Sequence, residues 1–112
     1  MLPSAPVFAA PPIILGANVF GWSLDAAASS AILDLAIARG LNVLDTADIY
    51  SHWAPGNVGG ESETIIGNWM QQRGNRQAVK IHTKGGAPGA PGDLANGNAT
   101  AAYLTKAVEA SL

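Results

Sequence analysis

Short apolar runs alternate with helical patterns three times along this chain, and this alternation limits its fold more than any other feature. Each run is short and contains branched side chains, and glycine or polar residues follow it, as in buried strands. We expect strands at 13–15, 41–45 and 79–84 and helices at 25–39, 62–73 and 100–112. Strands that alternate with helices are typical of a parallel sheet with right-handed crossovers. The sequence therefore predicts an α/β fold.

The ends of the helices are predicted from capping residues. Ser23 and Asp25 are both available as the N-cap of the first helix, and Ser62 is expected to cap the second. Gly40 and Gly74 follow the first two helices, where a left-handed residue commonly ends a helix.

Apolar side chains recur at helical spacing in all three helices, and we expect these side chains to face the core. The predicted core faces are Ala28, Ile32, Leu35 and Ala36 in the first helix, Ile65, Ile66, Trp69 and Met70 in the second, and Tyr103, Leu104, Ala107, Val108 and Leu112 in the third.

The length allows one modest core. The chain has 112 residues, less than half of the roughly 250 that a complete (β/α)₈ barrel needs. We divide it into an irregular, proline-rich arm at 1–12 and a βα segment at 13–112. A three-stranded parallel sheet would leave two open edges, and charged residues make up only 12% of the chain. Such a surface suits covering by more protein.

Charge and cysteine content exclude several classes of function. The net charge is −2 and the six Lys and Arg residues are scattered, so nucleic acid is not an expected partner. The chain has no Cys, which excludes disulfides and favours the cytoplasm. The first twelve residues contain neither a basic region nor a long apolar run, so we expect no signal peptide and no membrane span.

Residues with catalytic chemistry stand where the second and third strands end. Asp45 begins the segment Asp45-Thr46-Ala47-Asp48-Ile49-Tyr50, Gly59-Gly60-Glu61-Ser62-Glu63 follows it, and Thr83-Lys84 ends the third strand. These motifs, in this order, resemble the aldo-keto reductase signature around its catalytic Asp, Tyr and Lys. Gly16-Ala17-Asn18 and Phe20-Gly21-Trp22 are similar to the family's first strand and following loop. The resemblance covers residues 13–112 and implies the N-terminal portion of a TIM barrel, about three βα units of an incomplete barrel.

The resemblance also implies a reaction. Tyr50 would give a proton to the oxygen of an aldehyde or ketone while NADPH delivers a hydride to the carbon. A free tyrosine has a pKa of about 10, so the ammonium of Lys84 is expected to lower the pKa of Tyr50. Asp45 would keep Lys84 charged and oriented.

Cofactor contacts and a fourth catalytic residue follow from the same resemblance. The expected cofactor contacts are Gly16, Ala17, Asn18 and Asp45, with Ala17 standing where many members have Thr. The family's catalytic His is expected on a strand after Leu112, and neither His52 nor His82 matches its position. We therefore expect negligible turnover from this chain alone.

Other side chains near the motif leave two interpretations open. Trp22 and Trp53 are predicted on loops, as walls of a substrate pocket together with Tyr50 or as ordinary loop packing. His52 is expected to be exposed on a loop and His82 to pack between strand and helix, with no metal site at either.

A second function is compatible with the same residues. A partial barrel could serve as a binding or assembly module, similar to the potassium-channel β subunits that share this fold, or be a truncated product with no role of its own. For the reductase, the expected partner is a small carbonyl substrate. For the assembly module, the expected partner is a second copy of the chain or the remainder of the barrel.

Overall fold

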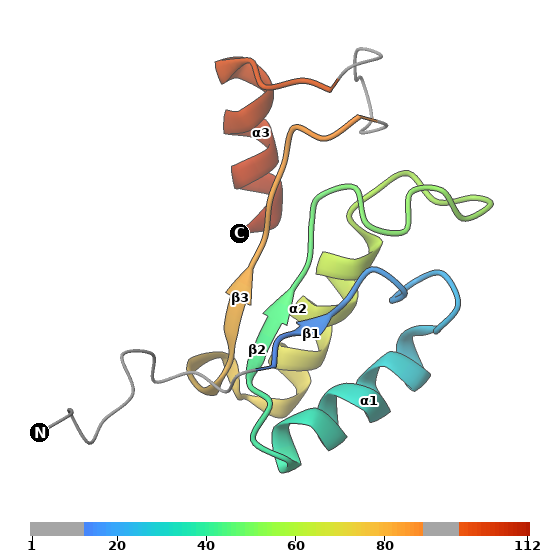
Figure 1. Ribbon diagram of the computed structural model, residues 1–112, viewed down its shortest axis with the longest axis vertical. Coiled ribbons are helices and arrows are strands. Elements are labelled where there is room, and N and C mark those ends of the chain that lie inside the picture. Colours follow the sequence, from blue (N-terminus) through green and yellow to red (C-terminus); the bar gives the residue numbers. More distant parts are fainter. Residues whose placement is uncertain (1–12, 89–96) are drawn as a thin grey trace, which may run out of the picture.

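The protein is described by a computed structural model that covers residues 13–88 and 97–112. The predicted arm at 1–12 lies outside the described residues, as does part of the predicted loop after the third strand. The elements, in order, are β1 (Leu15–Gly16), α1 (Ala26–Ala38), β2 (Val43–Asp45), α2 (Glu61–Arg73), a 3-10 turn η1 (Arg76–Ala78), β3 (Lys80–His82) and α3 (Ala101–Ser111) (Figure 1). The predicted alternation of strands and helices is confirmed.

The three strands form one parallel sheet in the order β1-β2-β3. Leu15 pairs with Leu44 and Leu44 with Ile81, while Gly16 pairs with Asp45 and Asp45 with His82. The first strand lies later in the chain than predicted, because only Leu15 and Gly16 lie opposite strand residues of β2. The predicted parallel α/β fold is confirmed.

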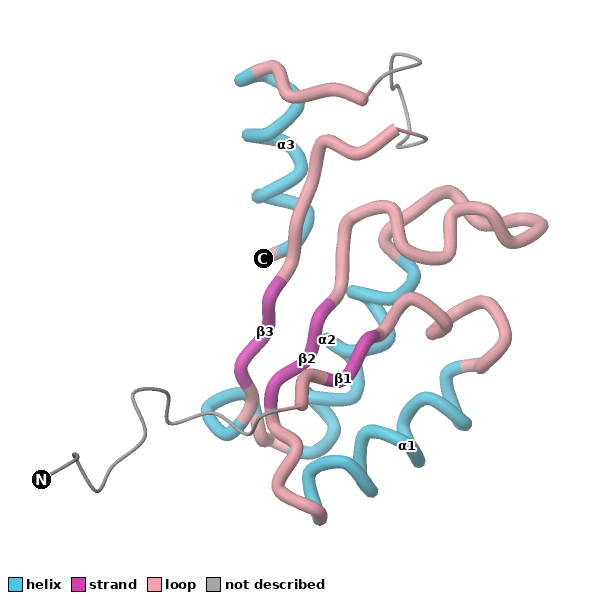
Figure 2. Tube along the Cα trace, viewed as in Figure 1, coloured by secondary structure: helices cyan, strands magenta, loops and turns pink. Residues whose placement is uncertain are grey.

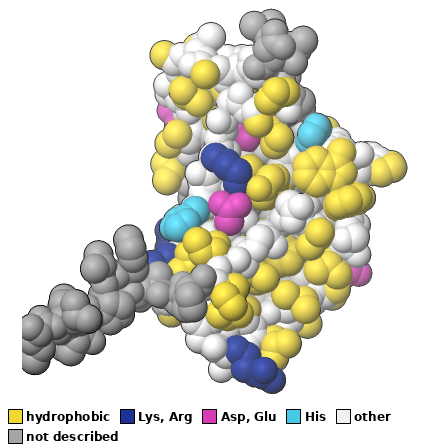
Figure 3. All heavy atoms as spheres, in the orientation of Figure 1, with side chains coloured by type: hydrophobic (Ala, Val, Ile, Leu, Met, Phe, Trp, Pro, Cys, Tyr) yellow, Lys and Arg dark blue, Asp and Glu magenta, His cyan; other side chains and the backbone are white. Residues whose placement is uncertain are grey.

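The register decides which side chains share a face of the sheet. Residues opposite one another in a parallel sheet point to the same side. Leu44 belongs to the buried core beneath the helices, and Leu15 and Ile81 pack against that core. Gly16, Asp45 and His82 therefore belong to the other face. Figure 3 shows an acidic, a basic and a histidine side chain exposed together near the middle of the molecule.

The core lies between the sheet and the first two helices. Leu33 of α1, Leu44 of β2 and Trp69 of α2 are buried in one cluster. The indole N–H of Trp69 donates to Asp34 Oδ1 at 2.8 Å, and Arg73 donates to both oxygens of Asp34. The side chain of Asp34 thus joins α1 to α2. The predicted core face of the second helix, with Trp69 inside, is confirmed.

The predicted core face of the first helix is wrong in part. Ile32 and Leu35 are 40% and 51% exposed, whereas Ser29, Leu33 and Ala36 are buried. These three residues follow the i, i+4, i+7 spacing of a single helix face. The prediction relied on the helical spacing of apolar residues, whereas the neighbouring elements decide which face of α1 is covered.

The predicted caps are confirmed with one exception. Asp25 Oδ1 accepts from the Ala28 N–H at 2.8 Å, and Gly40 and Gly74 have φ values of 80° and 63°. Ser62 does not cap α2, because Gly60 occupies the N-cap position. The buried Ser62 hydroxyl instead donates to the main-chain oxygen of Ala17 at 2.8 Å.

Helix α3 differs from the others because none of its residues is buried. It lies beside the segment that follows β3, beyond the strand ends (Figure 1). Val108 is 58% exposed and Leu112, which follows the helix, is almost fully exposed. The predicted core stripe of the third helix is therefore wrong in part: Tyr103 and Ala107 are half-buried, but Leu104, Val108 and Leu112 are exposed, because no further element of the described chain covers them.

Candidate active site

The ends of β2 and β3 bring a carboxylate and an ammonium together. Asp45 is the last residue of β2, and Lys84 lies two residues after His82, the end of β3. Since side chains two residues apart share a face, Lys84 lies on the face of Asp45 and His82. Lys84 Nζ donates to Asp45 Oδ2 and to the main-chain oxygen of Thr46, each at 2.9 Å.

Tyr50 completes the cluster from the loop that follows β2. Its hydroxyl donates to Asp45 Oδ2 at 3.3 Å, and Lys84 Nζ lies 4.6 Å from the centroid of its ring. The same carboxylate oxygen thus accepts one hydrogen bond from the phenol and one from the ammonium. The structure brings together the three side chains that the sequence singled out.

The environment of Lys84 favours its charged form. Burial lowers the pKa of Lys84, but the interactions with Tyr50 and Asp45 outweigh this effect and raise the pKa above its ordinary value of 10.5. The Lys84 and Asp45 side chains remain 52% and 38% exposed, so solvent screens the pair and its contribution to stability is small. Lys84 is an ammonium throughout the neutral pH range.

Main-chain hydrogen bonds continue beyond the strands and hold the cluster. The Thr46 N–H donates to the His82 oxygen at 2.8 Å, and the Asp48 N–H donates to the Lys84 oxygen at 3.0 Å. These bonds fix the backbone that follows Asp45 to the segment from His82 to Lys84.

Aromatic side chains stand next to Tyr50 on the open surface. The Trp22 and Trp53 rings meet edge to face at 5.6 Å, and Trp53 lies 6.3 Å from the Tyr50 ring. Both tryptophans are more than 40% exposed, so a large part of each ring is accessible at the surface. His52 is half-buried rather than exposed as predicted, and its Nδ1 bonds to the Ile49 oxygen at 2.9 Å.

The first strand contributes an open surface beside Asp45. Gly16 and Asn18 are exposed, whereas Ala17 is fully buried. The Ala17 N–H donates to the main-chain oxygen of Asp45 at 2.9 Å, so this N–H is bonded within the fold. His82 does not pack between strand and helix as predicted. It is exposed beside Asp45, because the alternation along β3 turns Ile81 toward the helices instead.

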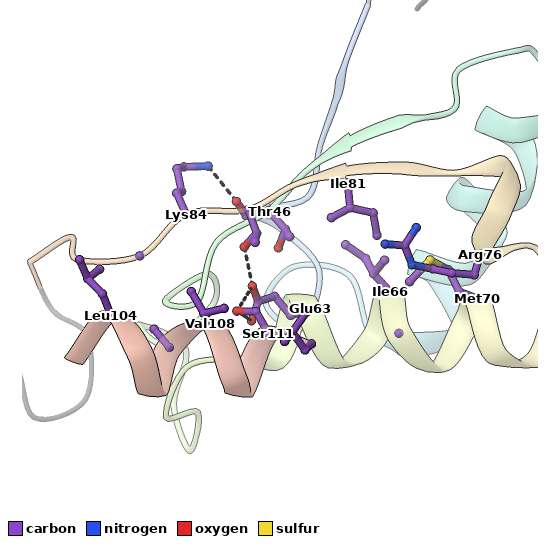
Figure 4. Close-up of a pocket in the computed structure, with 15 residues that line it drawn as sticks. Thr46, Glu63, Ile66, Met70, Arg76, Ile81, Lys84, Leu104, Val108 and Ser111 are labelled. Carbon is purple, nitrogen blue, oxygen red and sulfur yellow. Dashed lines mark hydrogen bonds between the residues drawn. The ribbon is translucent and has the colours of Figure 1, made fainter. Parts of the chain in front are cut away.

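The hollows near this cluster are lined by only part of it. A cavity of about 350 Å³ lies between α2, β3 and α3, and Leu104 and Val108 project into it (Figure 4). Its lining includes Lys84 but neither Asp45 nor Tyr50. Tyr50 and Lys84 border a hollow of about 100 Å³ on the loop side. A substrate at the cluster would bind an open surface.

A sequence model of the aldo/keto reductase family matches residues 12–112. The chain belongs to the aldo/keto reductase family. It is 53% identical over 78 residues to an uncharacterized 11.2 kDa protein of Pseudescherichia vulneris, a match that covers 69% of this chain and 76% of that protein. It is also 35% identical over 74 residues to the protein tas of Escherichia coli, covering 66% of this chain and 21% of that protein.

Other family members agree in fold and are longer. The chain is 37% identical over 81 residues to an NADP⁺ aryl-alcohol dehydrogenase of Phanerodontia chrysosporium, covering 65% of this chain and 19% of that protein. A crystal structure described as an aldo-keto reductase of Pseudomonas aeruginosa matches with a TM-score of 0.73 and 29% identity, over 95% of this chain and 38% of that one. The chain thus corresponds to part of a reductase barrel, as expected for an N-terminal portion.

Some residues that shape this reductase-family site were not predicted. Ser51 is fully buried between two loops, and Asn57 bridges the same loops. No periodicity marks them, because their partners are main-chain oxygens more than 30 residues away. Among residues 13–88 and 97–112, no cluster of acidic or histidine side chains could hold a metal ion, and no helix there could cross a bilayer.

Proposed function

We propose that this chain is the N-terminal catalytic portion of an NADPH-dependent reductase that converts aldehydes or ketones to alcohols, with Tyr50 as the proton donor. The observation that supports it is the shared oxygen Asp45 Oδ2, which accepts from Tyr50 at 3.3 Å and from Lys84 at 2.9 Å. Family membership and the position of this cluster at the carboxyl ends of parallel strands point the same way.

Each side chain of the cluster has a separate task. Tyr50 carries the proton that the carbonyl oxygen receives. The Lys84 ammonium, 4.6 Å from the ring, stabilises the negative charge that remains on the phenolate. Asp45 keeps Lys84 charged and in place through the 2.9 Å bond. Bound NADPH would supply the hydride, and protein groups would supply position and electrostatics.

The exposed surfaces around the cluster suit the two ligands. Gly16 and Asn18 flank Asp45 on the open face, and a side-chain carbon added at Gly16 would meet nothing closer than 4.0 Å. We assign this exposed surface at Gly16 and Asn18 to the nicotinamide end of the cofactor. Trp22 and Trp53, on the other side of Tyr50, form a wall for the carbonyl substrate. The absence of Cys and the use of NADPH support action in the cytoplasm.

The test is to complete the barrel. Residues 13–112 are fused to the remaining part of the Pseudomonas aeruginosa protein, and aldehyde-dependent loss of NADPH absorbance is measured. We expect turnover from the fusion and negligible turnover from the 112-residue chain. Tyr50→Phe should lower the rate of the fusion by about 10²–10⁴-fold, because the proton donor is lost. A folded fusion whose rate is unchanged by Tyr50→Phe would contradict the assignment.

A second candidate is an assembly module, and exposed apolar side chains favour it. Ile13 and Ile14 are exposed before β1, and Leu104, Val108 and Leu112 are exposed at α3. Open sheet edges with such neighbours promote association with further protein. Analytical ultracentrifugation should then show a mass that rises with concentration, and a monomer at all concentrations would rule this candidate out.

A further inference from the structure

Ser51, the residue directly after Tyr50, has an unusual backbone. Among residues 13–88 and 97–112 it is the one non-glycine residue with positive φ, at 72°. Its side chain is fully buried, although its hydroxyl is polar. A residue other than glycine rarely adopts this conformation unless its surroundings compensate for the strain. The surroundings of Ser51 must therefore supply specific interactions.

Those interactions join two loops. The Ser51 hydroxyl donates to the main-chain oxygen of Phe20 at 2.6 Å and approaches that of Asn18 at 3.3 Å. The Asn57 amide donates at 2.8 Å both to the Ser51 oxygen and to the Gly21 oxygen. The loop after β1 and the loop after β2 are thus linked at several points and lie side by side (Figure 2).

The loop after β1 also has no spare room where it meets the start of α2. Gly21 has a φ of 86°, and a side-chain carbon added there would lie 2.9 Å from Glu61 Cβ. Phe20 is buried in the core, so the carbonyl that receives the Ser51 hydroxyl is itself fixed. Ser51 is therefore tied to the rigid part of the molecule.

The contacts of the Tyr50 side chain are made with partly exposed groups, among them the Lys84 ammonium 4.6 Å from its ring centroid. Its hydroxyl makes one long hydrogen bond, at 3.3 Å, to a partly exposed carboxylate. Its ring neighbour Trp53 is 41% exposed. Since the phenol is weakly held at its tip, its placement over Lys84 depends on the backbone that carries it.

We propose that Ser51 is a positioning residue for Tyr50: its buried hydroxyl, bonded to the Phe20 carbonyl, locks the left-handed turn that presents the phenol to Asp45 and Lys84. Asn57 supports the turn because its side-chain amide donates to the main-chain oxygen of Ser51. The catalytic meaning of this role rests on the proposed reductase function, whereas the placement of the ring can be tested without it.

The experiment compares Ser51→Ala and Ser51→Gly with Ser62→Ala in the purified chain. Glycine adopts positive φ without strain, so Ser51→Gly removes the hydroxyl while it permits the turn. Ser62 is a matched control, because its buried hydroxyl also donates to a main-chain oxygen, that of Ala17 at 2.8 Å; it pairs with the Thr46 hydroxyl at 2.9 Å rather than with the turn that carries Tyr50. NMR with labelled lysine and aromatic side chains reports the titration of Lys84 and the contact between Tyr50 and Trp53.

We expect both Ser51 variants to lower the pKa of Lys84 toward its ordinary value and to weaken the Tyr50–Trp53 contact, because Tyr50 leaves the ammonium. Ser62→Ala should leave both signals unchanged while it lowers stability. The inference is overturned if Ser51→Gly keeps the wild-type signals, or if Ser62→Ala changes them equally.

Activity of the completed barrel separates this inference from the proposed function. Ser51→Gly should lower kcat by about tenfold with KM nearly unchanged, as for loss of orientation at the reacting group. If Tyr50→Phe leaves the rate intact, the proposed function fails while the NMR result on Ser51 still stands. If the NMR signals of Ser51→Gly match the wild type while Tyr50→Phe inactivates, only the positioning role fails.

Discussion

The sheet with α1 and α2 is held by buried apolar contacts, whereas α3 is held by polar contacts at its surface. In the first region Leu33, Leu44 and Trp69 share one core. In the second, no residue of α3 is buried. Tyr50 and Asp45 belong to the first region, and Lys84 lies where the chain leaves it for the second. The difference indicates that the cluster of Asp45, Tyr50 and Lys84 depends on the first region.

Helix α3 depends on two carboxylates for its attachment. The Tyr103 hydroxyl donates to Asp48, and the Ser111 hydroxyl donates to Glu63 at 2.9 Å. Glu63 also accepts from the Thr83 hydroxyl. With 11 residues, α3 is shorter than the ~12–15 at which isolated helices become even marginally stable in water. We therefore expect α3 to open at a lower free energy than the rest.

The largest effect should come from Trp69→Ala. Removal of this buried ring leaves a cavity in the first region and should cost about 3–5 kcal/mol of unfolding free energy, enough to unfold a small domain. Val108→Ala on α3 should change it by less than about 0.5 kcal/mol, because the side chain is 58% exposed. Urea denaturation followed by circular dichroism measures both. Equal losses would show that α3 shares the core.

Gly21→Ala should have the next largest effect. The alanine would have to keep the positive φ of Gly21, and its Cβ would lie 2.9 Å from Glu61 Cβ. We therefore expect a loss of about 2–4 kcal/mol of unfolding free energy. Gly40→Ala is the control, since Gly40 has a similar φ of 80° but nothing within 4 Å, and it should cost only about 1–2 kcal/mol. If both variants lose the same amount in thermal unfolding, the close contact between the loop after β1 and α2 is not a constraint.

The helix caps give a direct comparison of the two regions. Asp25 caps α1 and Thr100 caps α3, each by accepting from a main-chain N–H three residues later. Asp25→Ala should lower global stability by about 1 kcal/mol. Thr100→Ala should leave global stability nearly unchanged and speed hydrogen exchange of the α3 amides alone. Exchange that accelerates across the whole chain in Thr100→Ala would contradict the separation.

The smallest effect concerns the Asp34 link between α1 and α2. Hydrogen bonds from Arg73 and then from Trp69 lower the pKa of Asp34 from 3.8 to about 2. A lowered carboxyl pKa stabilises the fold above pH 3.8, and this contribution is lost as the pH falls toward 2. Asp34→Asn should therefore show a shallower decline in melting temperature over this range. Solvent exposure of the pair keeps the difference small, and identical pH profiles would show that the link contributes nothing.

Much of the fold could be predicted because local patterns determine it. Asp25, Gly40 and Gly74 act at the helix ends as expected, since capping depends on neighbouring residues. The exposed sides of α1 and α3 could not be predicted. Whether Ile32 or Val108 is covered depends on elements far along the chain or outside it, and helical spacing does not report which elements are present.

The site was predicted as far as strand ends determine it. Asp45 and Lys84 meet because parallel strands bring their carboxyl ends together, and Tyr50 joins them as the family motif implied. Ser51 could not be identified, because its importance lies in a backbone angle and a bond to Phe20, 31 residues earlier. Ser62 was misassigned because its hydroxyl serves the core rather than the helix end.

The three-stranded sheet has a consequence for any polymer of this chain. Because all strands run in one direction, a second copy that extends the sheet in the same sense must join its first strand to the third strand of its neighbour. Such a junction is head to tail, and repeats of three strands never add up to the eight of a closed barrel. Edge-to-edge addition by this route would therefore give an open ribbon or a ring with another number of strands, not an eight-stranded barrel.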